Sequence, residues 1–255
     1  MRLCVVVFTG CLLASAAFGN IYGFQNGGGL GGWAEFTDEG GGNLRIDLIN
    51  IGTGSITSNP QVLTGLFFNY TGGALTNPAA FKPTGEETWT DNSAATTLLD
   101  LGPFWAYRSN LTTIGGETVN FGFGASGFGG VFGAGDAISG SSSPGGVDYG
   151  VVNDGNAMAG FLPAANYTGC GSNTGLCNND PFVTFARFTL NYSGTFDFSK
   201  LSTIVFQYGS SLNESRACVG GGCLNEIPEP AQFLSLLLVG APLVWYYRRR
   251  RAAQA

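Results

Sequence analysis

The stretch NLRIDLINI, Asn43 to Ile51, alternates apolar and polar residues. Its leucines and the isoleucine at position 46 fall on one side of an extended chain, whereas Arg45 and Asp47 fall on the other. This is the pattern of a half-buried β-strand, so the stretch favours a fold built from sheets.

A turn is predicted at Ser58-Asn59-Pro60, and comparable stretches follow it along the chain. The other expected strands are Gln61–Thr71, Glu117–Ala125, Tyr149–Asn153, Pro181–Ser193 and Ser202–Ser211, the last being the final core strand. We expect a helical turn over Ala94–Leu101, and no long helix-period stretch lies outside the two termini. Strands separated by turn signals predict an all-β ectodomain, an antiparallel sandwich or jelly roll.

The composition agrees with this fold and restricts the partners. Gly 42 and Phe 20 stand beside only 11% charged residues, while 44% of the chain is hydrophobic, enough for a sizeable core. Between Asn20 and Pro230 six basic residues stand against all 17 acidic ones, a net charge of −11. A nucleic-acid partner is disfavoured, because phosphate binding needs a basic face.

The amino terminus has the three parts of a secretory signal. Arg2 is the charged region, Leu3 to Ala14 form the apolar core, and Ala17-Phe18-Gly19 is a small-x-small cleavage site. We place the signal peptide at residues 1–19 and the cut after Gly19. The alternatives are a retained membrane helix and a lipoprotein cut before Cys11.

Export determines the expected state of the cysteines. The mature chain keeps Cys170, Cys177, Cys218 and Cys223, an even number in an oxidising compartment, which indicates two disulfides. Four cysteines allow three pairings. We favour the local ones, Cys170–Cys177 and Cys218–Cys223, because glycine-rich turns close such short loops; a zinc site is the rival interpretation.

The carboxyl terminus, residues 227–255, combines three features. Pro228-Glu229-Pro230 is followed by the charge-free span Ala231–Tyr247, 17 residues long, which is at the short end of what crosses a bilayer. Four consecutive arginines, expected to stay cytoplasmic and to stop transfer, come next: Arg248, Arg249, Arg250 and Arg251.

Together these features resemble the PEP-CTERM sorting signal of bacterial surface proteins. The resemblance implies that an exosortase, a membrane-embedded cysteine transpeptidase, recognises Pro228-Glu229-Pro230 and removes the tail. Pro242 within the span departs from an uninterrupted helix. A permanent single-span anchor is the alternative. The segment Phe206-Gln207-Tyr208-Gly209, followed by a leucine and an acid, is similar to strands that precede the sorting tail in some exosortase-dependent proteins.

Candidate chemistry in the body, residues 20–226, is sparse. The chain has no histidine, which removes the commonest general base and imidazole metal ligands. Carboxylates can act in pairs, as in glycosidases, but solvated loop acids are the simpler reading of the candidates Glu35, Asp38, Glu39, Glu86 and Glu87. Asp148, Asp154 and Asn156 are weak calcium candidates without a complete loop signature. No other cofactor is expected.

Two further patterns have plain interpretations. GFGASG, Gly122 to Gly127, matches a nucleotide-binding fingerprint, yet a mobile glycine-aromatic loop is the better reading, with its phenylalanines packed within the sandwich rather than exposed. Five Asn-x-Ser/Thr sequons begin at Asn69, Asn110, Asn166, Asn191 and Asn213, and if modified they must lie on the surface.

The sequence thus predicts an exported, non-enzymatic cell-surface or extracellular-matrix protein that passes through the inner membrane as an intermediate. The expected partners are an exosortase-type transpeptidase and an exopolysaccharide or surface glycan. A carbohydrate- or ice-binding module is the first alternative, which needs a flat face of threonine and aromatic residues. A carboxylate-dependent secreted hydrolase is the second, which needs two facing acids in a cleft.

Overall fold

The computed structural model describes residues 19–26, 28–53, 59–83, 88–90, 93–94, 100–140, 150–153, 182–220 and 223. These residues form strands in two main sheets, and the helices among them are single 3₁₀ turns at Asn59–Gln61, Gly102–Phe104 and Phe198–Lys200. The expectation of an all-β chain with antiparallel sheets is confirmed. Within the described residues no helix is both long and apolar enough to cross a bilayer.

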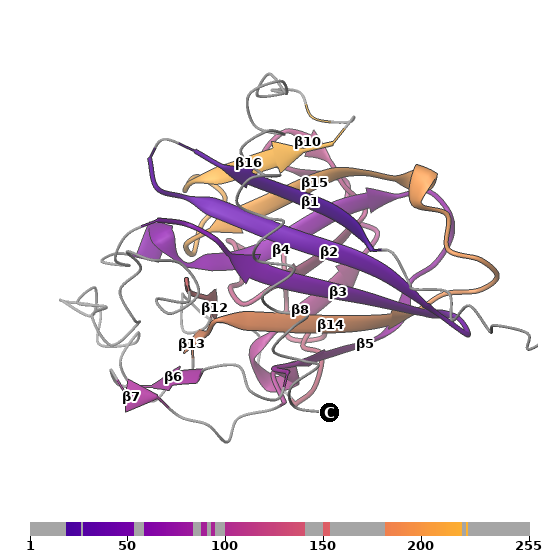
Figure 1. Ribbon diagram of the computed structural model, residues 1–255, viewed down its shortest axis with the longest axis horizontal. Helices are drawn as coiled ribbons and strands as arrows, with labels where there is room; N and C mark the ends of the chain where they lie inside the picture. Colours follow the sequence, from indigo (N-terminus) through magenta and orange to yellow (C-terminus); the bar gives the residue numbers. More distant parts are fainter. Residues whose placement is uncertain are drawn as a thin grey trace, which may run out of the picture.

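The first sheet has five strands, all paired antiparallel. It runs through strands from both halves of the chain, because β14 is inserted between β3 and β5 (Figure 1). In spatial order the strands are β1 (Asn20–Gln25), β2 (Gly31–Gly40), β3 (Asn43–Asn50), β14 (Phe185–Asn191) and β5 (Thr76–Phe81).

The second sheet lies behind the first in Figure 1. Its main path is β16 (Arg216–Val219), β15 (Leu201–Tyr208), β4 (Leu63–Tyr70), β12 (Gly150–Val151), β13 (Phe182–Val183), β6 (Thr88–Thr90) and β7 (Ser93–Ala94). Off this path, β11 (Phe121–Gly124) pairs with β4 and with β8 (Ala106–Ser109). β12 and β13 are paired in parallel. A separate hairpin joins β9 (Thr113–Ile114) to β10 (Glu117–Thr118).

Several expected strands differ in extent from those observed. The stretch Glu117–Ala125 is two strands, because Asn120 leaves the ladder and its side-chain amide bonds both backbone groups of Tyr70 at 2.8 Å. The stretch Pro181–Ser193 is likewise divided, at Thr184.

Another expectation is wrong. The final core strand is β16 rather than Ser202–Ser211, since Arg216 to Val219 continue the sheet beside β15. The expected helical turn over Ala94–Leu101 falls mostly on residues 95–99, which lie outside the described residues. Ala94 belongs to β7, and Asp100 forms a β-bridge with Phe81.

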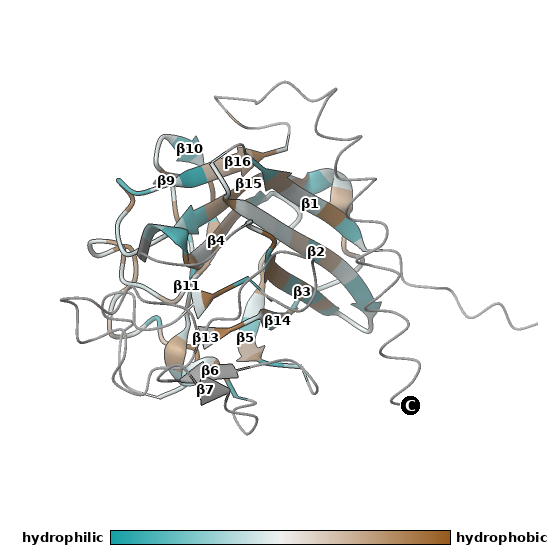
Figure 2. Cartoon of the chain, turned by 60° about the vertical axis from the view of Figure 1, so that its left-hand side comes forward, coloured by the Kyte–Doolittle hydropathy of each residue, from teal (hydrophilic) through white to brown (hydrophobic). Residues whose placement is uncertain are grey.

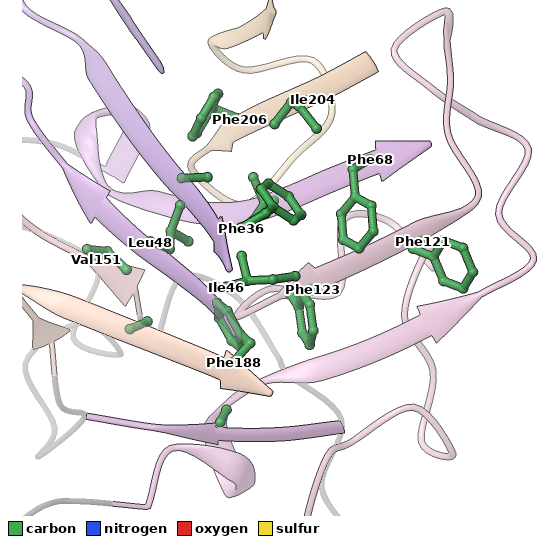
Figure 3. Close-up of a cluster of buried hydrophobic side chains, with 14 of the residues drawn as sticks. Phe36, Ile46, Leu48, Phe68, Phe121, Phe123, Val151, Phe188, Ile204 and Phe206 are labelled. Carbon is green, nitrogen blue, oxygen red and sulfur yellow. The ribbon is translucent and has the colours of Figure 1, made fainter. Parts of the chain in front are cut away.

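The main core lies between the two sheets, where their inward-facing side chains meet (Figure 3). Phe36 of β2 lies edge-on to Phe68 of β4, with ring centroids 5.3 Å apart. Phe123 of β11 stacks on Phe188 of β14 at 4.2 Å. Each such ring contributes roughly 1.5–3 kcal/mol by leaving water, so the aromatic residues hold the sheets together. Hydrophobic and hydrophilic residues alternate along β3, as this one-sided burial requires (Figure 2).

A second, smaller core covers the opposite face of the second sheet. Phe128 and Phe132, from the loop after β11, lie over Phe67 of β4 with centroids 5.7 Å and 5.9 Å from its ring. Glycine makes this layer fit: a Cβ at Gly122 would lie 2.3 Å from the Phe67 ring, and one at Gly124 2.3 Å from the Phe132 ring. Much of the pairing of glycine with phenylalanine in this chain therefore has a packing reason.

Chain segments cover two of the exposed strand edges. Leu101 donates its backbone N–H to Ala80 of β5 at 2.9 Å. Beside β8, Tyr107 donates to Asp136 at 2.8 Å and Ile138 donates to Trp105 at 2.9 Å. Covered edges do not offer free backbone groups to another chain.

Candidate functional site: the outer face of the five-stranded sheet

The outer face of the five-stranded sheet carries most of the polar chemistry of the described residues. Odd-numbered residues of β2, β3 and β14 point outward, since the even-numbered ones fill the core. The register places them in three rows across the strands: Thr37, Arg45 and Thr189; Glu35, Asp47 and Arg187; and Trp33, Ile49 and Phe185.

An ion pair between Arg187 and Asp47 lies at the centre of this face. Arg187 Nε donates to Asp47 Oδ1 at 2.5 Å, and Nη2 donates to Oδ2 at 2.8 Å. Two parallel bonds from a planar guanidinium give a fixed geometry that a lysine could not reproduce. The Asp47 side chain is 4% exposed. Burying a carboxylate so far from water is costly unless it is paired, and these two bonds pair it.

Arg45 extends the network to the neighbouring strand. Its Nη1 donates to Glu39 Oε1 at 2.6 Å, and its Nη2 donates to Thr37 Oγ1 at 3.2 Å. Its Nε lies 3.3 Å from Asp47 Oδ2, close enough for charge attraction but without the geometry of a hydrogen bond. The ion pairs therefore connect β2, β3 and β14 into one charged cluster.

The aromatic residues of this face are not available as a flat platform. Trp33 is 4% exposed and Phe185 is 3% exposed, and the Arg187 guanidinium lies over the Phe185 ring at 5.5 Å. The row of Thr37, Arg45 and Thr189 places a guanidinium between its two threonines. The flat threonine and aromatic surface required by a carbohydrate- or ice-binding module does not occur in these described rows.

Three asparagines form a row of amides near one end of the same sheet. Asn77 Nδ2 donates to Asn191 Oδ1 at 3.0 Å, and Asn191 Nδ2 donates to Asn43 Oδ1 at 2.7 Å. Asn43 and Asn77 are exposed.

The acids singled out in the sequence have different surroundings. Glu39 is paired with Arg45, and Asp38 accepts a hydrogen bond from the Tyr192 hydroxyl. Partial burial, together with the Asp38 carboxylate, raises the pKa of Tyr192 to about 12. Glu86 and Glu87 lie outside the described residues.

Glu35 is different. It is half-buried, and among the described carboxylates it is the one for which the structure shows no hydrogen bond or ion pair. Its register partner on β3 is Asp47, so two carboxylates stand side by side. Asp47 is nearly enclosed by its arginines, which makes this pair a poor match to the open cleft that a carboxylate-dependent hydrolase requires.

The segment after β15 is a turn held by several buried hydrogen bonds. Gln207 is fully buried, and its Nε2 donates to the backbone oxygens of Tyr208, Ser211 and Ser215 at 2.9, 3.0 and 3.2 Å. Gly209 has a φ of 73°, which favours glycine. The Glu214 carboxylate accepts the Ser211 N–H at 2.7 Å and also the Ser210 N–H. This geometry accounts physically for a Phe-Gln-Tyr-Gly segment followed by an acid.

The disulfide between Cys218 and Cys223 is confirmed, with Cα atoms 5.7 Å apart. Cys170 and Cys177, the calcium candidates Asp148, Asp154 and Asn156, and the whole sorting tail from Pro228 to Arg251 lie outside the described residues. Of the cleavage site, Ala17 also lies outside, whereas Gly19 directly precedes β1. Within the described part of the chain no three acidic or cysteine side chains gather as a metal site does.

The sequons and the glycine-rich fingerprint can also be placed. Asn110 and Asn213 are exposed, Asn69 and Asn191 are half-buried, and Asn166 lies outside the described residues. The fingerprint begins in β11, and turns rather than a helix follow it, so it lacks the helix amino terminus of a nucleotide site. Gly122–Gly124 belong to β11, within the expected strand Glu117–Ala125, so the loop reading is wrong for these three residues. Phe123 packs between the sheets as expected, whereas Phe128 and Phe132 are buried on the opposite face of the second sheet.

Sequence reasoning did not single out the Arg187–Asp47 pair or the asparagine row. Both partners of each contact are visible as polar residues within alternating strands. Their pairing depends on a register that joins β3 to β14, more than a hundred positions along the chain.

Comparisons with known proteins found no relative of this chain. No family model, no curated protein and no solved structure matches the chain. The function is therefore argued from the residues themselves.

Proposed function

We propose that this chain is an exported, non-enzymatic cell-surface or extracellular-matrix protein that an exosortase processes at its carboxyl terminus. The observation that carries the proposal is the order of Pro228-Glu229-Pro230, the charge-free span Ala231–Tyr247 and the arginines at 248–251. Each part occurs alone in many proteins, whereas the ordered combination resembles the PEP-CTERM signal.

Charge and bilayer thickness explain how the tail works in this proposal. Seventeen helical residues at about 1.5 Å each just cross the hydrocarbon. A cation costs roughly 2.5–3.5 kcal/mol at the bilayer centre on insertion scales, so four arginines stop passage of the tail. The stalled chain leaves Pro228 to Pro230 at the outer boundary, where a membrane-embedded peptidase reaches an extended segment.

The folded part of the chain supports this arrangement by its position. The Cys218–Cys223 disulfide fixes the end of β16 and leaves only a short link to the motif, since Cys223 is five residues before Pro228. The described strands begin at Asn20, directly after the proposed signal peptide. An all-β domain with a disulfide and a net charge of −11 between Asn20 and Pro230 suits an oxidising, extracellular setting.

Intact-mass analysis of protein from the cell surface and the medium tests the proposal. The mature form should end within or close to Pro228-Glu229-Pro230. Glu229→Gln should leave full-length protein in the inner membrane, while the matched control Glu226→Gln, an acid two positions before the motif, should be processed as the wild type. A surface form that retains Trp245 and the arginines means a plain membrane anchor and contradicts the proposal.

A surface glycan is the second part of the proposal, and the asparagine row is the observation that favours it. Asn43 and Asn77 are exposed and already aligned across β3, β14 and β5. Amide groups both donate to and accept from sugar hydroxyls. Co-sedimentation with the exopolysaccharide of the producing cell should be weakened by Asn43→Ala with Asn77→Ala and unchanged by Asn110→Ala. Equal sedimentation of all three proteins contradicts a glycan site at this row.

A further inference from the structure

The strand β1 begins beside a carboxylate that has no partner. Gly19 precedes β1, and in the register of β1 with β2 Asn20 is opposite Phe36 and Ile21 is opposite Glu35. A Cβ added to Gly19 would lie 2.5 Å from Glu35 Oε1 and 2.7 Å from Thr37 Oγ1. The Gly19 backbone therefore rests against the Glu35 carboxylate.

Neither guanidinium of the outer face pairs with Glu35. On the outer face, three carboxylates (Glu35, Glu39 and Asp47) are accompanied by two guanidiniums, Arg45 and Arg187. Both guanidiniums bond to Glu39 or Asp47. Glu35 stands directly opposite Asp47 in register, and like charges in that position destabilise a sheet. One further positive charge at this place would complete the cluster.

Signal cleavage supplies such a charge at the right position. Hydrolysis of the Gly19–Asn20 bond consumes one water and leaves a carboxylate on Gly19, which departs with the signal peptide. It leaves an amine on Asn20, which is protonated at neutral pH because α-amino groups have pKa values of about 7.7–8.0. The nitrogen of Asn20 is about 2.4 Å from the Gly19 Cα by covalent geometry, so it lies within reach of the Glu35 side chain.

We propose that Glu35 is the docking site for the mature amino terminus: the α-ammonium group of Asn20 forms an ion pair with Glu35 and fastens β1 to β2. This inference rests on the cut after Gly19 in the proposed function. It assigns a role to Glu35 that is neither catalytic nor that of a solvated loop acid.

Mature protein from the exporting cell is used for the test, and its first residue is read by intact mass. The pKa of the α-amino group is then measured by NMR after labelling by reductive methylation with ¹³C-formaldehyde. In the wild type we expect a pKa raised by about 0.5–1 unit, as an opposite charge nearby favours the charged form. Glu35→Gln should return it to the ordinary range, while the matched control Glu39→Gln should leave it raised.

The outcomes are separable. A start at a residue other than Asn20 overturns the proposal at its cleavage step. A start at Asn20 with the same α-amino pKa in wild type and Glu35→Gln overturns the docking itself, even where the carboxyl terminus is processed as proposed. As a second readout, Glu35→Gln should lower the unfolding temperature of the mature protein but not of a chain with Gly-Ser added before Asn20, because the extension moves the ammonium away. Equal lowering in both chains contradicts the ion pair.

Discussion

Arg187 holds Asp47 through two parallel hydrogen bonds, of 2.5 Å and 2.8 Å, between positions 140 residues apart in the sequence. The pair joins β3 to β14 on a face where Asp47 is almost fully removed from water. Removing Asp47 leaves the Arg187 guanidinium without its carboxylate partner.

We therefore expect Asp47→Ala to lower the free energy of unfolding by about 3 kcal/mol. Arg187→Met should cost less, because Arg45 still stands beside Asp47. The double variant Asp47→Ala with Arg187→Met should be more stable than Asp47→Ala alone, since it buries no unpaired charge. Urea denaturation of the four proteins as a double-mutant cycle measures the coupling. Additive losses would show that the two side chains do not interact.

Tyr192 predicts a loss of stability at alkaline pH. Its folded-state pKa is raised to about 12 from the ordinary value of 10.0, first by burial and then by Asp38. Between these two pH values Tyr192 loses its proton in the unfolded chain but keeps it in the folded chain. The stabilisation that the protonated Tyr192 hydroxyl gives to the folded state is therefore complete below pH 10 and is lost as the pH rises to 12. The stability advantage of wild type over Tyr192→Phe should shrink across that window in chemical denaturation. Asp38→Asn, which removes the carboxylate charge, should show a weaker decline. Parallel curves for wild type and Tyr192→Phe would contradict the assignment.

Adding one methyl group at a glycine beneath an aromatic ring should destabilise the protein, whereas adding one at an open glycine should not. Gly122→Ala and Gly124→Ala should each lower the free energy of unfolding by about 1–3 kcal/mol, because the new Cβ overlaps the Phe67 or Phe132 ring. Gly135→Ala is the matched control, since nothing lies within 4 Å of its Cβ. Guanidinium denaturation compares the three variants. A Gly122→Ala protein as stable as Gly135→Ala would show that the rings have room to move.

The confirmed disulfide predicts a modest, redox-dependent stability. Cys218 and Cys223 are five positions apart, and closing so short a loop is worth about 2 kcal/mol in the chain-entropy description. Cys218→Ser with Cys223→Ser should lose that amount, and wild type in reducing agent should lose the same. Non-reducing peptide mapping should recover the two cysteines in one linked peptide. Free thiols at both positions in exported protein would contradict the pairing.

The sequence predicts the strands whose alternation is strong, and the reason is local. In β3 and β14 apolar residues occur at every second position, so burial on one side can be read without knowing the partner strand. The same pattern does not predict β1, β2 and β5, since β1 and β2 contain glycines and β5 contains Pro78. Their strand character comes from the neighbours with which they pair.

The outer face could be anticipated only in part. The acids Glu35, Asp38 and Glu39 are visible as candidates in the sequence. What distinguishes them is their partners, Tyr192 for Asp38 and Arg45 for Glu39, and these follow from packing and strand register. The buried state of Asp47 likewise depends on a strand that begins at Phe185.

The insertion of β14 beside β3, and of β15 beside β4, determines the order in which the chain can fold. Thr64 Oγ1 donates to the Gln207 carbonyl across 143 residues, and Arg187 reaches Asp47 across 140. Contacts of such long range slow folding, because the loop between the partners must close before they contribute. A chain that crosses a membrane from its amino terminus presents β3 and β4 long before β14 and β15 arrive. In the proposed export, the aromatic faces of the early strands therefore stay uncovered until Phe185 to Tyr208 have emerged, and in this interval they are the segments that a holdase chaperone would bind.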